Sequence, residues 1–164
     1  MRDKFFMRLC LSEARKAYIA EEVPVGALVV APGGELISRA HNLSVHMNSP
    51  VAHAEILAIM EAAKALSNFR LVACTLYVTK EPCVMCAGAI IEARIKRLVF
   101  GCFDQKRGMF GSLLDVNRLA LNHKVEVRGG VLRQQSEDLL RRFFRQRRGT
   151  EAVITGPTRN RLFA

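Results

Sequence analysis

Pro82-Cys83-Val84-Met85-Cys86, together with the earlier His53-Ala54-Glu55, is the stretch of sequence from which both fold and chemistry are predicted. One imidazole and two thiols can hold zinc tetrahedrally and leave the fourth position to water. Zinc lowers the pKa of such a water to about 7. We therefore predict His53, Cys83 and Cys86 as the ligands of one zinc ion per subunit. Glu55, two residues from the imidazole, is predicted to be the catalytic proton carrier.

The cysteine pair has two other interpretations. A Cys-x-x-Cys pair also occurs in redox proteins and as half of a structural zinc site. A redox pair requires no His-x-Glu, and a structural site requires a fourth ligand. The other candidate ligands are not paired at ligand spacing: Cys10, Cys74, Cys102, His41 and His46. We interpret the three cysteines among them as buried small apolar residues and favour the catalytic site.

The sequence places these ligands in the first turns of two helices. Ser49-Pro50 is typical of an N-cap followed by a proline in the first turn, and predicts a helix over 51–66. Its apolar face is predicted from the helical period as Ala52, Ile56, Ile59, Met60 and Ala63. Pro82 predicts a second helix from Cys83 to about Arg94. Free N–H groups and the helix dipole there favour the thiolate form that binds metal.

The remaining pattern predicts strands alternating with helices. We expect helices over 4–21 and 112–117 and near the C-terminus, and strands over 25–30, 35–41, 75–79, 97–101 and 124–128. This order favours a mixed sheet covered on both faces. At 164 residues, one domain is expected. We place it at residues 1–148 and interpret 149–164 as a flexible tail.

Composition narrows the class of protein. Half of the residues are hydrophobic and 24% are charged, an ordinary globular balance. No apolar run approaches the ~20 residues of a membrane helix, and charges interrupt the N-terminal segment too often for a signal peptide. Five cysteines, two of them assigned to a metal, fit a reducing compartment. We therefore predict a cytoplasmic protein that does not bind membranes.

The net charge of +10 is typical of a protein that binds a polyanion. Two segments concentrate it. The first segment, 133–148, has only two acidic residues, Glu137 and Asp138. It has six arginines: Arg133, Arg141, Arg142, Arg145, Arg147 and Arg148. The other, 104–111, is a glycine-containing loop with two cations and an aromatic residue, Phe110, that we expect to be exposed for stacking on RNA bases. A single arginine is more simply a solvated charge, whereas the whole cluster favours RNA contact.

The chain resembles the cytidine deaminase superfamily and, more specifically, the bacterial tRNA-specific adenosine deaminases. The resemblance runs from about residue 5 to about residue 148 and rests on segments 22–27, 41–42, 52–56, 75–79, 81–88 and 108–113. It implies a three-layer α/β/α fold with a central mixed sheet of about five strands. It also implies a zinc-dependent homodimer that hydrolyses adenosine to inosine at the wobble position of a tRNA anticodon, with Glu55 carrying the protons.

The resemblance further implies substrate-binding residues. Asn42 is expected to hold the base through its amide, and Ala54 to offer a backbone contact. Asp104, Lys106, Asn122 and His123 are expected to contact the anticodon loop or lie near it. From the residues alone, Asn42 is equally a turn residue after a strand, and His123 is equally a surface histidine.

Three residues depart from the family pattern. Lys80 stands where leucine is expected, and Ser49 and Val51 flank Pro50 where acidic or polar and threonine residues are more usual. All three concern the rim of the site. Two rival functions remain at this stage: a deaminase of a free base or nucleotide, of the guanine or cytidine type, and a non-catalytic RNA-binding module stabilised by zinc.

Overall fold

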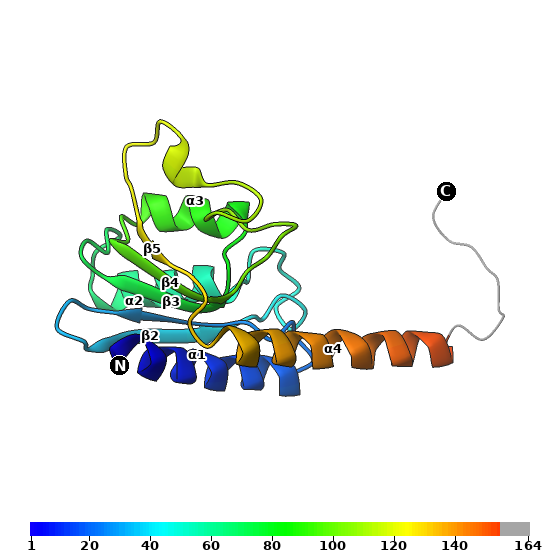
Figure 1. The fold of residues 1–164 in the computed structure, drawn as a ribbon. Coiled ribbons are helices and arrows are strands. Elements are labelled where there is room, and N and C mark those ends of the chain that lie inside the picture. Colours follow the sequence, from blue (N-terminus) through cyan, green and yellow to red (C-terminus); the bar gives the residue numbers. More distant parts are fainter. Residues whose placement is uncertain (155–164) are drawn as a thin grey trace.

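The computed structural model describes the backbone of residues 1–154 and the side chains of residues 1–148. Its elements are shown in Figure 1 and follow the order α1 (Arg2–Ile19), β1 (Gly26–Val30), β2 (Leu36–His41), α2 (Ala54–Ala65), β3 (Thr75–Lys80), α3 (Val84–Glu92), β4 (Arg97–Cys102), the 3₁₀ helix η1 (Val116–Arg118), β5 (Glu126–Arg128) and α4 (Arg133–Ile154). No described helix is both long enough and apolar enough to span a membrane.

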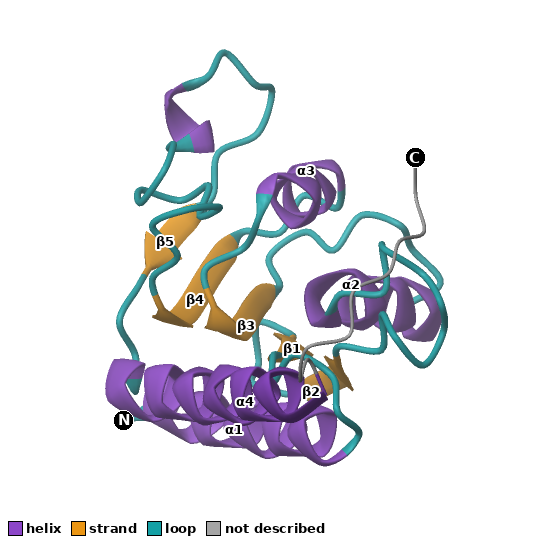
Figure 2. Ribbon diagram, turned by 90° about the vertical axis from the view of Figure 1, so that its right-hand side faces the viewer, coloured by secondary structure: helices purple, strands orange, loops and turns teal. Residues whose placement is uncertain are grey.

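The strands form one mixed sheet in the order β2-β1-β3-β4-β5. β1 pairs antiparallel with β2 and β3, whereas β4 pairs parallel with β3 and β5. Figure 2 shows α1 and α4 on one face of the sheet and α2 and α3 on the other. The predicted three-layer α/β/α fold with about five strands is confirmed.

The central strands are apolar on both faces because helices cover both faces. In β1, Ala27 and Val29 belong to the core under α2 and α3. Leu28 and Val30, which point the other way along the strand, belong to the core under α1. The three cysteines that were interpreted as buried small apolar residues, Cys10, Cys74 and Cys102, are buried free thiols, which confirms their interpretation.

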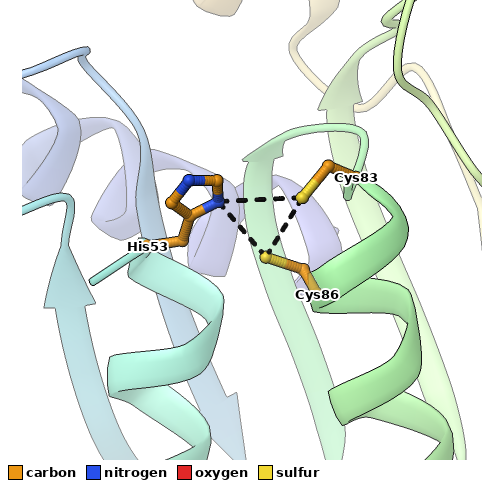
Figure 3. Close-up of side chains that lie close together, drawn as sticks. All are labelled: His53, Cys83 and Cys86. Atoms are coloured by element: carbon orange, nitrogen blue, oxygen red, sulfur yellow. Dashed lines mark hydrogen bonds between the residues drawn. The ribbon is translucent and has the colours of Figure 1, made fainter. Parts of the chain in front are cut away.

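The parallel pairing of β3 and β4 positions the candidate site. Thr75 lies opposite Arg97 and Lys80 opposite Cys102, so both strands end at the same edge of the sheet. The helix α3, which connects them, begins at this edge. The first turn of α2 lies beside the first turn of α3, as the close-up in Figure 3 shows.

The predicted start and buried face of α2 were wrong. The helix begins at Ala54 with His53 as its N-cap, whereas Ser49 lies in a preceding turn where its N–H donates to the carbonyl of Ser44 (2.9 Å). The buried residues are Ala54, Glu55, Ala58, Ile59 and Ala62. Met60, predicted to be buried, is 60% exposed. A face of small alanines packs closely against the sheet, and this turns Met60 outward.

α4 is anchored on α1 by its middle turns. The ring of Phe143 is buried against Tyr18, with ring centroids 6.0 Å apart, and Arg147 donates to the carbonyl oxygen of Glu21 (2.9 Å). Phe144, the next residue, is 44% exposed. The helix extends to Ile154 and so covers the first part of the predicted tail, 149–164. The rest of that tail lies outside the described residues.

A buried carboxylate ties the N-terminus to the sheet. Asp3 accepts two hydrogen bonds from Arg97 (2.9 and 2.8 Å), one from Arg128 (2.6 Å) and one from the hydroxyl of Tyr77 (2.9 Å). The Arg97 guanidinium, helped by Tyr77 and Arg128, holds the pKa of Asp3 well below its usual value. α1 is therefore joined to β3, β4 and β5 through one side chain.

Replacing Asp3 by asparagine is expected to lower the free energy of unfolding at pH 7 by about 3 kcal/mol, because Arg97 loses a buried charged partner. Since folding lowers the pKa of Asp3, its stabilisation is present above the unfolded pKa of about 4 and is lost as the pH falls further. Urea denaturation at pH 7 and pH 3 tests this. The difference between parent and variant should shrink at pH 3, and an unchanged difference would contradict the assignment.

Candidate metal centre and base-binding pocket

Three metal-ligating side chains meet where α2 and α3 begin (Figure 3). The Nδ1 atom of His53 lies 3.8 Å from the sulfur of Cys83 and 3.4 Å from that of Cys86, and the two sulfurs are 3.7 Å apart. Cys83 is the N-cap of α3, with Cys86 one turn further on. Within the described part of the chain, this is the one cluster with the geometry of a metal site.

These distances fit a zinc ion. Tetrahedral zinc with bonds of about 2.3 Å to sulfur and about 2.05 Å to nitrogen requires about 3.8 Å between sulfurs and about 3.5 Å between nitrogen and sulfur. The observed triangle agrees to within a few tenths of an ångström. Three protein ligands leave one position open, as in catalytic rather than structural sites. The structure brings together all three ligands predicted from the sequence.

The short distances within the triad shift the pKa values of His53, Cys83 and Cys86. The hydrogen bond between the two sulfurs lowers the pKa of Cys83 to about 3 and raises the pKa of the Cys86 thiol. The hydrogen bond with Cys83 also raises the pKa of His53. A bound metal requires both cysteines as thiolates, so binding should release protons.

Glu55 lies in the first turn of α2 and is only 4% exposed. Burial raises the pKa of its carboxyl group. The residue lines the same pocket as His53 and Cys83. A carboxylate with a raised pKa beside an open metal position is suited to take up and return protons near neutral pH.

The pocket in front of the cluster has a volume of about 290 Å³. This is at the small end of ligand sites, which span about 300–1,000 Å³. The Oδ1 atom of Asn42 accepts a hydrogen bond from the N–H of Ala54 (2.8 Å), so the structure brings these two predicted residues together. Asn42 lines the pocket, and its Nδ2 keeps donor capacity for a bound base.

A buried carboxylate that the sequence analysis did not assign organises one wall of the pocket. Glu81 accepts hydrogen bonds from the N–H groups of Asp104 (3.0 Å), Phe110 (3.0 Å) and Ser112 (3.1 Å), and from the hydroxyl of Ser112. Only Pro82 and Cys83 separate it from the start of α3. The segment 104–112 is therefore fastened to the residue next to Pro82. A charged residue between a strand and a metal-binding helix is the signal that points to it.

Of the two predicted contacts in this segment, only one lines the pocket. Asp104 lies in the pocket wall and pairs with Lys80 across 2.5 Å, whereas Lys106 is exposed and does not line it. Phe110, predicted to be exposed for base stacking, is buried, and that prediction was wrong. Its N–H is held by Glu81, so its ring packs into the core under α2 and α3.

Asn122 and His123 do not lie in this pocket. They line a separate hollow with Arg70, Arg94 and Lys96, where Arg94 donates to the side chain of Asn122 (2.8 Å) and His123 contacts the carbonyl of Ile95 (2.7 Å). Arg94 and Ile95 follow the C-terminal end of α3, whereas the zinc ligands lie at its N-terminal end. The structure therefore separates these two residues from the metal centre of the same chain.

The predicted arginine cluster on α4 is exposed in the structure. Its side chains differ in their partners: Arg141 pairs with Glu137 (3.1 Å), and Arg147 lies over the ring of Phe143. Arg142, Arg145 and Arg148 are exposed. The outward display of positive charge agrees with the sequence analysis.

A mixed five-stranded sheet that holds an open His-Cys-Cys centre beside a buried glutamate defines the cytidine-deaminase-like class of proteins. The chain matches the model of the MafB19-like deaminase family over residues 1–148. It is 46% identical over 147 residues to the tRNA-specific adenosine deaminase of Bacillus subtilis (strain 168), covering 89% of this chain and 91% of that relative. The chain belongs to the tRNA-specific adenosine deaminase family.

Solved structures agree with this assignment. A structure from a study of A-to-I editing by tRNA:A34 deaminases superposes with a TM-score of 0.79 at 42% identity, covering 83% of this chain and 99% of that chain. A guanine deaminase from Nitrosomonas europaea superposes with a TM-score of 0.71 at 28% identity, covering 84% of this chain and 81% of that one. The same fold therefore serves an RNA substrate and a free base.

Proposed function

We propose that this chain hydrolyses adenosine to inosine at the wobble position of a tRNA anticodon, in the cytoplasm and with zinc as its metal. The observation that carries the proposal is one small pocket that joins the His53, Cys83 and Cys86 triad to the buried carboxylate of Glu55. The names of the relatives support adenosine in tRNA as the substrate.

The predicted metal ligands and Glu55 have different roles in the reaction. His53, Cys83 and Cys86 would hold zinc, which supplies a water molecule of lowered pKa. Glu55 takes one proton from the water that attacks carbon 6 of adenine and passes it to a ring nitrogen. It then takes the second proton, from the hydroxyl group now on carbon 6, and passes it to the leaving amine, so that ammonia departs and the oxygen remains as the carbonyl of inosine. Burial of Glu55 excludes competing solvent from these transfers.

The size of the pocket suits a single base turned out of the RNA, so the rest of the anticodon loop has to bind outside it. We propose that Asn42 contacts the base with its amide, near the backbone of Ala54. Asp104 and Lys106 would contact the flanking nucleotides, and the arginines of α4 would add positive charge for the RNA backbone. We do not extend this role to Asn122 and His123 within one subunit.

We also propose a homodimer, in which RNA contacts are shared between subunits. Large apolar side chains remain exposed on and around α2 and α3, where a second subunit would bury them: Met60, Leu66, Phe69, Val72 and Val84. Sedimentation equilibrium tests this proposal. A monomer at micromolar concentration would contradict it.

Incubation with an anticodon stem-loop that carries a wobble adenosine tests the function. Inosine should form, while the same stem-loop with a wobble guanosine, free guanine and free cytidine should remain unchanged. Turnover of a free base with an unchanged stem-loop would favour the rival free-base deaminase. Stem-loop binding without any turnover would favour the non-catalytic RNA-binding module.

Gly108 provides a test of the wall of the pocket. A Cβ atom at this position would lie 2.6 Å from Oε1 of Glu81, and that carboxylate is fixed by its hydrogen bonds to segment 104–112. We expect Gly108→Ala to lower kcat/KM by about 10²-fold, because displacement by about 1 Å is enough for such a loss. The control is Gly33→Ala, where an added Cβ meets no atom within 4 Å. Equal activities of the two variants would show that the wall tolerates displacement.

A further inference from the structure

Lys80 and Asp104 form an ion pair at the mouth of the pocket. Lys80 is the last residue of β3, and Asp104 follows the end of β4 on the neighbouring strand. The ammonium nitrogen lies 2.5 Å from Oδ2 of Asp104, and the side chains are 28% and 12% exposed. Both residues line the pocket that contains His53 and Glu55. The resemblance to the family predicts leucine at position 80, where this chain has lysine.

Asp104 holds a fixed position. Its Oδ1 accepts the N–H groups of Lys106 (3.1 Å) and Arg107 (3.2 Å), while its own N–H donates to Glu81 (3.0 Å). Burial alone would raise the pKa of Asp104, but the ammonium of Lys80 and these two N–H groups lower it. The carboxylate is therefore ionised, and it holds the ammonium of Lys80 in one place at the mouth.

The ammonium group keeps capacity for a further partner. A lysine has three donors, and Asp104 uses one of them. The other charged residues of the pocket wall include three acids, Glu22, Glu55 and Glu81, and one further cation, Arg107. A polyanion that approaches this acidic wall needs a cation there, and Lys80 is a cation of the wall that a fixed carboxylate holds in place.

We propose that Lys80 binds a backbone phosphate of the nucleotide next to the target base, and that Asp104 positions its ammonium for this contact. The proposal rests on the proposed function, because it requires that the target base enters the pocket as part of an RNA chain. Lys80 then fixes the RNA at the mouth. Leucine at the same position would offer the phosphate no donor.

The test measures the dissociation constant of the anticodon stem-loop in a Glu55→Ala background, so binding is determined whether or not inosine forms. Adding Lys80→Met should weaken binding about tenfold, the loss expected for one charge-assisted hydrogen bond. The slope of log affinity against log salt should become shallower by about 0.7, corresponding to one phosphate on a single strand. The matched control, Lys4→Met, removes the same charge from the exposed surface of α1. Equal effects of the two variants would overturn the proposal.

A second variant separates phosphate binding from simple neutralisation of Asp104. If Lys80 only cancels the charge of Asp104, the double variant Lys80→Met with Asp104→Asn should bind as tightly as Asp104→Asn alone in the same background. If Lys80 binds phosphate, the double variant should bind more weakly than Asp104→Asn alone. Equal affinities of these two variants would therefore overturn the proposal, and weaker binding by the double variant supports it.

Neutral linkages locate the phosphate. Methylphosphonates, which carry no charge, replace the phosphates beside the wobble nucleotide one at a time. One replacement should weaken binding to the protein with Lys80 and have no further effect once Lys80 is methionine. Purely additive losses at every linkage would overturn the proposal. Failure of the proposed function would appear separately, as an absence of inosine with Glu55 intact.

Discussion

Replacing Glu55 by alanine is expected to lower kcat for the stem-loop by about 10³–10⁴-fold, at the upper end of the effect of general acid–base catalysis. The side chain is buried beside the metal triad, and each of the proposed proton transfers passes through its carboxylate. The fold should persist, because removing a buried ionisable group whose pKa is raised by burial relieves an unfavourable desolvation. Single-turnover formation of inosine under saturating protein measures the chemical step.

Zinc content and stem-loop affinity provide the controls for that prediction. Both should stay close to those of the parent, because Glu55 belongs neither to the ligand triangle nor to the basic surface. Glu55→Gln keeps the size of the side chain and should be equally inactive, since an amide cannot carry the proton. A variant that retains more than about a tenth of the parent kcat would mean that another group moves the proton.

Replacing Cys86 by alanine is expected to abolish zinc binding and, with it, detectable turnover. Cys86 is fully buried, and its sulfur lies 3.7 Å from that of Cys83 and 3.4 Å from Nδ1 of His53, so its loss leaves only two of the three predicted ligands. A metal that binds only the folded chain also stabilises it. The variant should therefore unfold at a lower temperature than the zinc-loaded parent, and a chelator should lower the Tm of the parent but not that of the variant.

Cys102→Ala is the matched control for the metal centre. Cys102 is also a buried thiol, but it lies at the end of β4 and outside the triad. This variant should retain one zinc per chain by atomic emission and respond to the chelator as the parent does. If Cys86→Ala retained zinc, the assignment of the ligands would be wrong. If Cys102→Ala lost it, the metal would be held by a different set of cysteines.

The sequence alone predicted the order of elements and the position of Cys83 and Cys86 at the start of a helix, because both depend on short-range patterns. The ligand spacing of Cys83 and Cys86 is one helical turn, and strands such as 75–79 carry their own apolar pattern. Local patterns also predicted the exposure of the arginines on α4. The prediction for the start of α2 was wrong because serine followed by proline is typical of a helix start. In this chain the two residues belong to a turn before the helix.

Only the tertiary structure decided what surrounds the triad. Glu81 binds backbone groups from a segment more than twenty residues later, and this binding draws Phe110 into the core where exposure was expected. Lys80 meets Asp104 because two parallel strands end together. Such contacts join residues distant in sequence, and their free energy depends on burial and geometry that no local pattern contains. The sequence thus determined which groups could hold the metal, and the fold decided which side chains form the pocket around it.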